Sequence, residues 1–254
     1  MDLDFLNKTV LITGSSRGIG RATAQRFAQL SARVVIHYHE NRKAAEQTLT
    51  DLPGGPHLIV QADISDPASV QNMMDTVLKE TGRIHVLVNN AGIFEEYPIF
   101  DLTYKEWQRI WARTIGTNLM GPANVSFRMI QHMKAQGGGK IVNVSSRGAF
   151  RGEPNAPAYG ASKAGLNALS QSMALALAPH NIFVYVVAPG FVETDRIAPL
   201  LSGPRGDALR AQSPFGRVAY PEEVANTIAF LASEGTDYLT GCIVDINGAS
   251  YLRT

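Results

Sequence analysis

Two serines, a tyrosine and a lysine lie close together in the segment NVSSRGAFRGEPNAPAYGASK, residues 143–163. Tyr159 and Lys163 are four residues apart, so a helix would place both on one face. Tyrosine, with a pKa of about 10, is a poor acid near neutrality, but a cation beside it stabilises the phenolate and lowers that pKa. A serine hydroxyl can hold a substrate oxygen by a hydrogen bond. These residue types predict proton transfer at a carbonyl or alcohol oxygen, with Tyr159 as the acid in reduction and the base in oxidation.

The two serines, Ser145 and Ser146, are neighbours just past a predicted strand. Successive side chains of a strand point to opposite faces, so only one of the two can face the reacting group. Taken singly, such serines are usually turn formers, and a tyrosine and a lysine one turn apart are usually a surface pair. Their combination with a glycine-rich loop elsewhere in the chain favours catalysis.

That glycine-rich loop is TGSSRGIGRATA, with glycines at positions 14, 18 and 20. Gly14 permits a tight turn, Gly18 lets the backbone approach a phosphate, and Gly20 lets the following helix pack close to the strand. The first turn of that helix presents free N–H groups to a pyrophosphate. The loop follows the first predicted strand and therefore predicts a dinucleotide site at the carboxyl end of a parallel sheet.

The choice of dinucleotide depends on the second predicted strand, which ends RVVIHYHEN. A site for NAD places an acidic residue there, on the ribose 2′-hydroxyl. This chain has Tyr38, flanked by His37 and His39, and its first acid, Glu40, comes two residues later. Arg17, inside the glycine loop, could bind a 2′-phosphate with two hydrogen bonds. The sequence favours NADP(H) over NAD(H).

These groups need elements to position them, and short apolar runs alternate with helical stretches along the chain. The runs lack polar alternation, as strands covered on both faces do. They span residues 9–13, 34–37, 57–60, 84–88, 141–144, 183–187 and 243–246. Helices are predicted between them, including stretches over 104–136 and 157–178. The repeated alternation predicts an α/β fold: a Rossmann-type doubly wound parallel sheet of about seven strands with helices on both faces.

No linker divides the chain, so we expect one dinucleotide-binding and catalytic domain over residues 1–254, with 191–216 as its substrate loop. Lys and Arg total 23 against 22 Asp and Glu, which gives no support to nucleic-acid or acidic-membrane binding. The chain has one cysteine, no signal-peptide pattern and no apolar run near the roughly 20 residues that cross a bilayer. We expect a cytoplasmic protein, and we expect no metal site.

The motifs together resemble those of the short-chain dehydrogenase/reductase family, over essentially the whole chain. They are TGSSRGIG at 13–20, NNAG at 89–92, Asn118, the serine–tyrosine–lysine set, and PGFVET at 189–194. The chain is similar to the single-domain members, which include 3-oxoacyl-[acyl-carrier-protein] reductases and many sugar, steroid and cyclic alcohol dehydrogenases.

The resemblance implies a catalytic set of Asn118, Ser146, Tyr159 and Lys163. The family's interval of thirteen positions from serine to tyrosine selects Ser146. The lysine would also bind the nicotinamide ribose, and Asn118 would support a water chain leading to it. The predicted cofactor contacts are Gly14, Ser16, Arg17, Gly18, Ile19, Gly20, Tyr38, His39, Asp63, Ile64, Asn90, Ala91, Gly92, Tyr159, Lys163, Pro189, Gly190, Val192 and Thr194. The predicted substrate contacts are Ser146, Phe94, Phe150, Glu153 and Tyr159.

The leading interpretation is an NADP(H)-dependent oxidoreductase that transfers a hydride between the nicotinamide and a ketone or secondary alcohol, and that resembles 3-oxoacyl-[acyl-carrier-protein] reductases. The alternatives are a sugar, steroid or cyclic alcohol dehydrogenase using NAD, and a non-catalytic dinucleotide-binding protein. Arg196, Arg205 and Arg210 could meet an acidic acyl carrier, although solvated loop arginines are the simpler interpretation. The resemblance also implies a homotetramer, with a dimer as the alternative.

Overall fold

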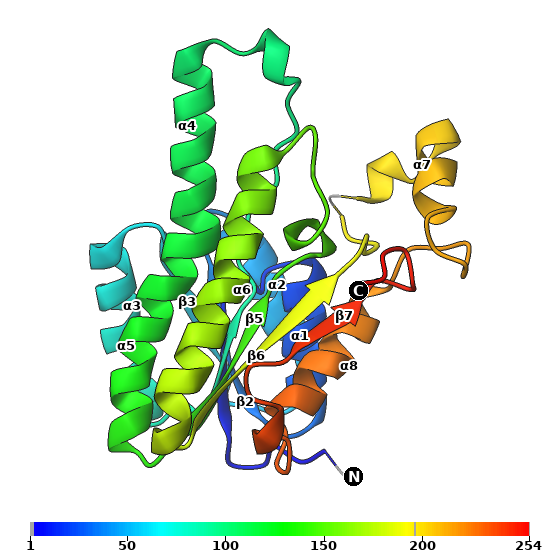
Figure 1. Ribbon diagram of the computed structural model, residues 1–254. Coiled ribbons are helices and arrows are strands. Elements are labelled where there is room, and N and C mark those ends of the chain that lie inside the picture. The colour runs from blue at the N-terminus through cyan, green and yellow to red at the C-terminus, as the bar shows by residue number, and fades with distance from the viewer. Residues whose placement is uncertain (1–2, 196, 254) are drawn as a thin grey trace.

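The protein is described by a computed structural model that covers residues 3–195 and 197–253 (Figure 1). Seven parallel strands form one sheet in the order β3-β2-β1-β4-β5-β6-β7. The strands are β1 (Thr9–Ile12), β2 (Arg33–Tyr38), β3 (Leu58–Gln61), β4 (Val86–Asn89), β5 (Gly139–Val144), β6 (Ile182–Pro189) and β7 (Ile243–Ile246). The strand order reverses between β1 and β4, and such a reversal opens a crevice at the carboxyl ends of the strands.

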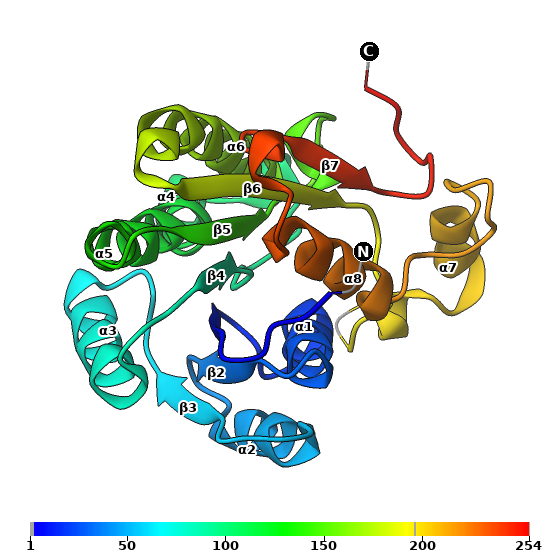
Figure 2. The same cartoon turned by 90° about the horizontal axis from the view of Figure 1, so that it is seen from below.

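Helices cover both faces of the sheet, as Figure 2 shows along the strands. One face carries α1 (Gly18–Gln29), α2 (Arg42–Asp51) and α8 (Pro221–Ala232). The other carries α3 (Pro67–Thr81), α4 (Tyr104–Ile115), α5 (Gly121–Ala135) and α6 (Pro157–Leu177). The predicted doubly wound α/β fold is confirmed, and each predicted apolar run contains or overlaps a strand.

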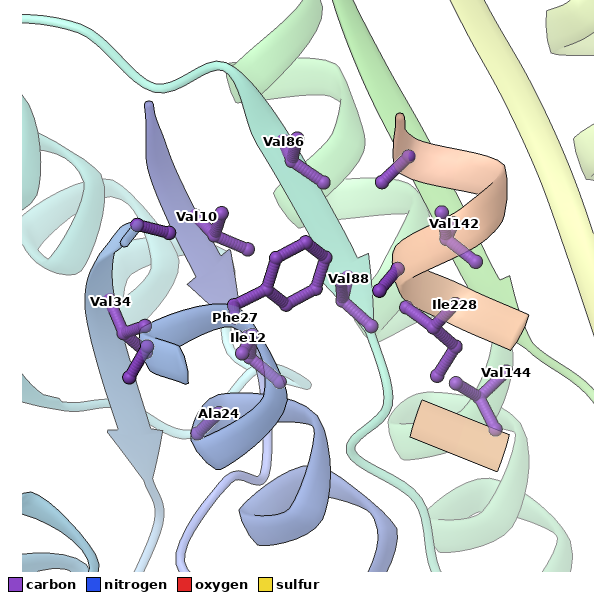
Figure 3. Packing of buried hydrophobic residues seen from close by; sticks show 14 of the residues in the cluster. Val10, Ile12, Ala24, Phe27, Val34, Val86, Val88, Val142, Val144 and Ile228 are labelled. Atoms are coloured by element: carbon purple, nitrogen blue, oxygen red, sulfur yellow. The ribbon is translucent and has the colours of Figure 1, made fainter. Parts of the chain in front are cut away.

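Alternate residues of the central strands build two separate cores. Val10 and Ile12 of β1 face α1 and α8, whereas Leu11 between them faces the opposite helices. Phe27 of α1 is fully buried and lies among Val10, Ile12 and Val88 (Figure 3). Burial of an aromatic side chain of this kind contributes about 2–3 kcal/mol to folding. The two cores fix the strands whose carboxyl ends carry the site.

Local signals in the sequence set where several helices begin. Asp66 accepts hydrogen bonds from the backbone N–H groups of Ala68 and Ser69 and so caps α3, which starts at Pro67. Thr103 and Glu106 form a reciprocal capping box at α4.

Two features of the helices could not be read from such signals. A π-helical turn, Gly116–Met120, joins α4 to α5 inside the predicted helical stretch 104–136. The region 191–216 contains a short 3₁₀ turn, Ala198–Leu200, and the helix α7 (Gly203–Arg210), which stands apart from the sheet in Figure 1. Among the described residues, every helix is too short or too polar to span a membrane.

Candidate active site

A cavity of about 740 Å³ lies at the carboxyl ends of the strands. It is lined by the glycine loop after β1 and by the segments that follow β2 to β6. All the predicted cofactor contacts line it, as do Ser146, Tyr159, Lys163, Phe94 and Glu153. Asn118 and Phe150 do not. The structure therefore brings most of the predicted residues to one place.

The glycine loop is shaped by contacts that leave no room for side chains. Gly14 has a φ of 65°, and a Cβ there would lie 2.8 Å from the Cα of Ala91. A Cβ on Gly20 would lie 2.3 Å from the carbonyl oxygen of Gly14 and 2.5 Å from Nδ2 of Asn90. Across the cavity, the Cβ position of Gly18 comes within 3.1 Å of Thr194 Cγ2. The backbone is thus free to approach a dinucleotide pyrophosphate, and these residues fit that group.

The NNAG segment after β4 is tied to the glycine loop by hydrogen bonds. The hydroxyl oxygen of Thr13 accepts hydrogen bonds from the backbone N–H groups of Asn90 and Ala91, each at 3.0 Å. The Asn90 side chain donates in return to the carbonyl oxygens of Thr13 and Gly14, at 2.9 and 3.0 Å. Two loops far apart in sequence are therefore held as one wall of the cavity.

His37, at the end of β2, supports the glycine loop by a hydrogen bond to its backbone. Its Nδ1 accepts a hydrogen bond from the backbone N–H of Gly14 at 2.9 Å, and its Nε2 lies 3.1 Å from the carbonyl oxygen of Ala62. These partners require the neutral ring with its proton on Nε2. Burial lowers the pKa of His37 to about 4. Sequence reasoning missed this role, and its only signal was a histidine inside an apolar strand.

The adenosine end of the cavity carries charges of both signs. Arg17 is exposed at the start of α1, and Glu40 is exposed after β2. His39 Nε2 lies 3.7 Å from a carboxylate oxygen of Asp63, which also accepts hydrogen bonds from the backbone and hydroxyl of Ser65. Tyr38, the residue where an NAD site would place an acid, is largely buried in the core.

The two serines after β5 have different surroundings. Ser145 is 4% exposed, and its hydroxyl donates to the carbonyl oxygen of Lys163 at 3.3 Å. Ser146 is partly exposed to the cavity, and its hydroxyl oxygen accepts the backbone N–H of Gly148 at 3.0 Å. The hydroxyl proton of Ser146 is thereby left for another acceptor, which suits a group that holds a substrate oxygen.

Tyr159 and Lys163 lie on the first turns of α6. The Lys163 ammonium is 5.8 Å from the centre of the Tyr159 ring and donates a hydrogen bond to the carbonyl oxygen of Val144 at 2.8 Å. Phe94 packs edge-on against the Tyr159 ring, with 4.9 Å between ring centres. Lys163 is 4% exposed, so its charge acts across a short distance with little screening by water.

Asn118 is fully buried in the π-helical turn, one layer behind the cavity wall. Its side chain accepts the backbone N–H of Ile93 at 2.8 Å and donates to the carbonyl oxygen of Ile93 at 2.9 Å. It also donates to the Ser162 hydroxyl at 3.2 Å. Asn118 therefore joins the segment after NNAG to α6, next to Lys163.

Phe150, a predicted substrate contact, does not line the cavity. Phe150 ends the 3₁₀ turn Arg147–Ala149, which turns its ring towards the C-terminal segment. There the Arg253 guanidinium lies 4.3 Å from the ring centre, and the Tyr251 hydroxyl donates to the Phe150 carbonyl oxygen. Phe191, which was not among the predicted contacts, lines the cavity.

Arg147, next to Ser146, is buried and connects three segments. Its guanidinium donates to Ser250 Oγ at 2.6 Å and to Gln212 Oε1 at 2.9 Å, and it lies 5.1 Å from the Phe191 ring centre. Burial lowers its pKa. The Arg147 side chain therefore connects the segment after β5 to region 191–216 and to the C-terminal segment.

The loop arginines considered for an acidic carrier are already paired. Arg205 lies 2.7 Å from a Glu96 carboxylate oxygen, and Arg210 lies 2.6 Å from Asp207. Arg196 lies outside the described residues.

Comparison with known proteins places this arrangement in context. A protein-family model described as "Enoyl-(Acyl carrier protein) reductase" matches residues 14–249. The 3-oxoacyl-[acyl-carrier-protein] reductase FabG of Escherichia coli (strain K12) is 36% identical over 250 residues, which cover 98% of this chain and 100% of that protein. The cis-4-hydroxycyclohexanecarboxylate dehydrogenase of Sinomonas cyclohexanicum is 39% identical over 246 residues, with 96% of each chain covered. The solved structure titled "Crystal structure of gox2181" aligns with a TM-score of 0.91 and 32% identity, covering 98% of this chain and 97% of that one.

Proposed function

Because the chain belongs to the short-chain dehydrogenase/reductase family, we propose that it reduces a ketone to a secondary alcohol, with NADPH as its preferred cofactor and Tyr159 as the proton donor. The chain is an NAD(P)-dependent oxidoreductase that acts on CH–OH groups. One observation carries the proposal: Ser146, Tyr159 and the buried Lys163 line the same cavity as the glycine loop. A protein that only binds the dinucleotide does not need the first two.

Different residues of the chain bind the cofactor and transfer the proton. Gly14, Gly18, Arg17 and Thr194 would hold the dinucleotide, and the nicotinamide supplies the hydride when it is bound. The Ser146 hydroxyl holds the carbonyl oxygen of the substrate. Tyr159 donates a proton to that oxygen, and the positive charge of the nearby Lys163 stabilises the phenolate that results.

Preference for NADPH is supported by the residues at the adenosine end. No carboxylate stands at the end of β2, where Tyr38 is buried, and Arg17 has the charge and geometry to bind a 2′-phosphate. Glu40 is the neighbouring group that would instead favour an unphosphorylated ribose. We expect Arg17→Ala to weaken NADPH binding about 10- to 100-fold, the effect of losing hydrogen bonds to a charged group.

Fluorescence titration with both cofactors tests this preference. NADH affinity should be nearly unchanged in Arg17→Ala, and Glu40→Gln is the matched control that should keep the preference for NADPH. Tighter NADH than NADPH binding by the unchanged protein would refute the choice of cofactor without affecting the proposed reaction.

A second candidate function is reduction of 3-oxoacyl groups on an acyl carrier protein, which is favoured by the 36% identity to the E. coli reductase. Arg205 and Arg210 give it no added support, because each already lies beside a carboxylate of the chain, Glu96 and Asp207 respectively. Assay with acetoacetyl-CoA and an acetoacetylated carrier protein, beside free ketones, distinguishes the two. A large preference for the carrier-bound substrate would establish the second candidate.

We further propose a cytoplasmic homo-oligomer, a tetramer or a dimer, built from the single domain. Large apolar side chains that remain exposed on α4, α5 and α6 support an interface there: Tyr104, Phe127 and Leu175. Light scattering measures the state directly, and a monomer at micromolar concentration would contradict the proposal.

A further inference from the structure

Glu153 places a half-buried carboxylate in the wall of the cavity that also holds Ser146 and Tyr159. Its side chain occupies space left by two glycines. A Cβ on Gly148 would lie 2.7 Å from Glu153 Oε1, and a Cβ on Gly160 would lie 3.9 Å from its Cβ and Cγ. Gly148 follows the serine by two residues and Gly160 follows the tyrosine directly. The carboxylate is therefore packed against both segments that carry the acid–base machinery.

Within residues 3–195 and 197–253, the Glu153 carboxylate has no hydrogen-bond donor and no ion-pair partner. The two other glutamates near this end of the cavity are paired: Glu95 with Arg109 and Arg113, and Glu96 with Arg205. Water can hydrogen-bond a half-buried carboxylate in an open cavity, but a ligand that displaces this water must supply a donor in its place or leave the carboxylate unpaired. Its placement therefore indicates a substrate that carries a hydrogen-bond donor.

The surrounding charges decide which donor that is. Burial raises the pKa of Glu153, the positive charges of Arg151 and Arg147 oppose that rise, and the negative charge of Glu96 adds to it. Arg151 and Arg147 offset the negative charges of Glu153 and Glu96, so the site has no net negative charge that would select an ammonium group. A neutral hydroxyl can donate to Glu153 without bringing a further charge into the cavity.

We propose that Glu153 accepts a hydrogen bond from a substrate hydroxyl on the carbon next to the reacting carbonyl, so that the substrates are α-hydroxy ketones and the products vicinal diols. This inference rests on the proposed ketone reduction and names its substrate class. Glu153 acts as a specificity-determining residue, while Ser146 and Tyr159 hold and protonate the carbonyl oxygen.

The distances allow both contacts at once. A Cβ on Gly148 would lie 2.7 Å from Glu153 Oε1, and the Gly148 nitrogen lies 3.0 Å from Ser146 Oγ. With standard bond lengths within the glycine, Glu153 Oε1 and Ser146 Oγ are therefore at most about 8 Å apart. Two substrate oxygens about 3 Å apart, each making a hydrogen bond of about 2.8 Å, can span that distance. Oxygens on neighbouring carbons have this spacing. An unsubstituted 3-oxoacyl chain carries no hydroxyl, so it would leave the carboxylate without a donor and should react more slowly.

The test compares acetoin with butanone, which differ only in the α-hydroxyl group. Initial rates with NADPH give kcat/KM for each ketone in the unchanged protein, Glu153→Leu and Glu153→Gln, with Glu96→Gln as the matched control. We expect acetoin to be preferred by about 10- to 100-fold in the unchanged protein and in Glu96→Gln. In Glu153→Leu the preference should fall to within about threefold of unity, through loss of acetoin turnover alone. NADPH affinity should stay the same, because Glu153 packs against Gly148 and Gly160, neither of which is a predicted cofactor contact.

Turnover of both ketones without a preference, or a preference that survives in Glu153→Leu, would overturn the assignment of Glu153 and leave ketone reduction standing. If the leucine variant does not fold, the isosteric Glu153→Gln decides by the same ratio. Absence of turnover with every ketone and both cofactors would refute the proposed reaction instead. In that case, calorimetric titration of the NADP⁺ complex with meso-2,3-butanediol and with 2-butanol tests the role of Glu153. Equal affinities for the two alcohols would overturn the proposed hydrogen bond to Glu153.

Discussion

The buried histidine behind the glycine loop makes a specific prediction about acid sensitivity. His37 has a pKa of about 4 in the folded protein because it is buried, against about 6.5 in an unfolded chain. The unfolded chain therefore takes up this proton first as the pH falls. The free energy of unfolding should decrease with falling pH between about 6.5 and 4, and His37 alone should account for a loss of about 3 kcal/mol over that window.

The same protonation should also weaken cofactor binding. A protonated His37 cannot accept the backbone N–H of Gly14, so the loop that would hold the pyrophosphate loses its support from β2. His39 and Asp63 are the other titratable groups whose charges reach this ring, the first lowering and the second raising its pKa. We expect NADPH affinity and stability to decline together below about pH 5.

Urea unfolding and NADPH titration between pH 7 and 4 measure these effects in the unchanged protein and in His37→Asn. Asparagine can still accept the Gly14 N–H but does not titrate. The unfolding free energy of the variant should therefore fall by about 3 kcal/mol less than that of the unchanged protein between about pH 6.5 and 4. His85→Asn is the matched control. The pKa of His85 is also lowered to about 4, chiefly by burial, but its ring accepts the N–H of Thr9, away from the cavity. Parallel curves of stability against pH for the unchanged protein and His37→Asn would refute the reasoning.

The contacts predict the outcome of four further substitutions. Ser146→Ala should lower kcat about 100- to 1,000-fold, whereas Ser145→Ala should lower it less than about tenfold, and the reverse order in steady-state assays would exchange their roles. Gly20→Ala places a Cβ 2.3 Å from the Gly14 carbonyl oxygen and should weaken NADPH binding at least about 100-fold in a fluorescence titration, so unchanged affinity would contradict the described loop. Phe27→Ala removes a fully buried ring and should lower the unfolding free energy by about 3–5 kcal/mol, and a loss below about 1 kcal/mol in urea would show that the core differs from that described.

Much of the fold could be predicted because it depends on short-range patterns. Strands such as β1 and β6 are buried on both faces, so nearly all their residues are apolar and stand out in the sequence. Helix starts with a cap or proline, as at Asp66 and Pro221, are equally local. The glycine loop and the cavity residues could be predicted for a related reason, since a parallel sheet brings the ends of its strands to one edge.

The roles that local patterns could not predict depend on long-range packing. Phe150 was expected at the substrate, but a 3₁₀ turn directs it towards Arg253, more than a hundred positions later. The role of His37 exists only because β2 ends beside both Gly14 and Ala62. Asn118 was assigned from the resemblance alone, and the π-helical turn that aims it at Ile93 has no local signature in the sequence.

The central claim is that Tyr159 supplies the proton for reduction of a ketone at this site. It is tested most directly by comparing the unchanged protein with Tyr159→Phe across a panel of ketones, following NADPH consumption, with NADPH affinity measured alongside. We expect turnover by the unchanged protein, and in the variant a fall of about 100- to 10,000-fold in kcat with cofactor affinity preserved. Equal turnover by the two proteins would contradict the account.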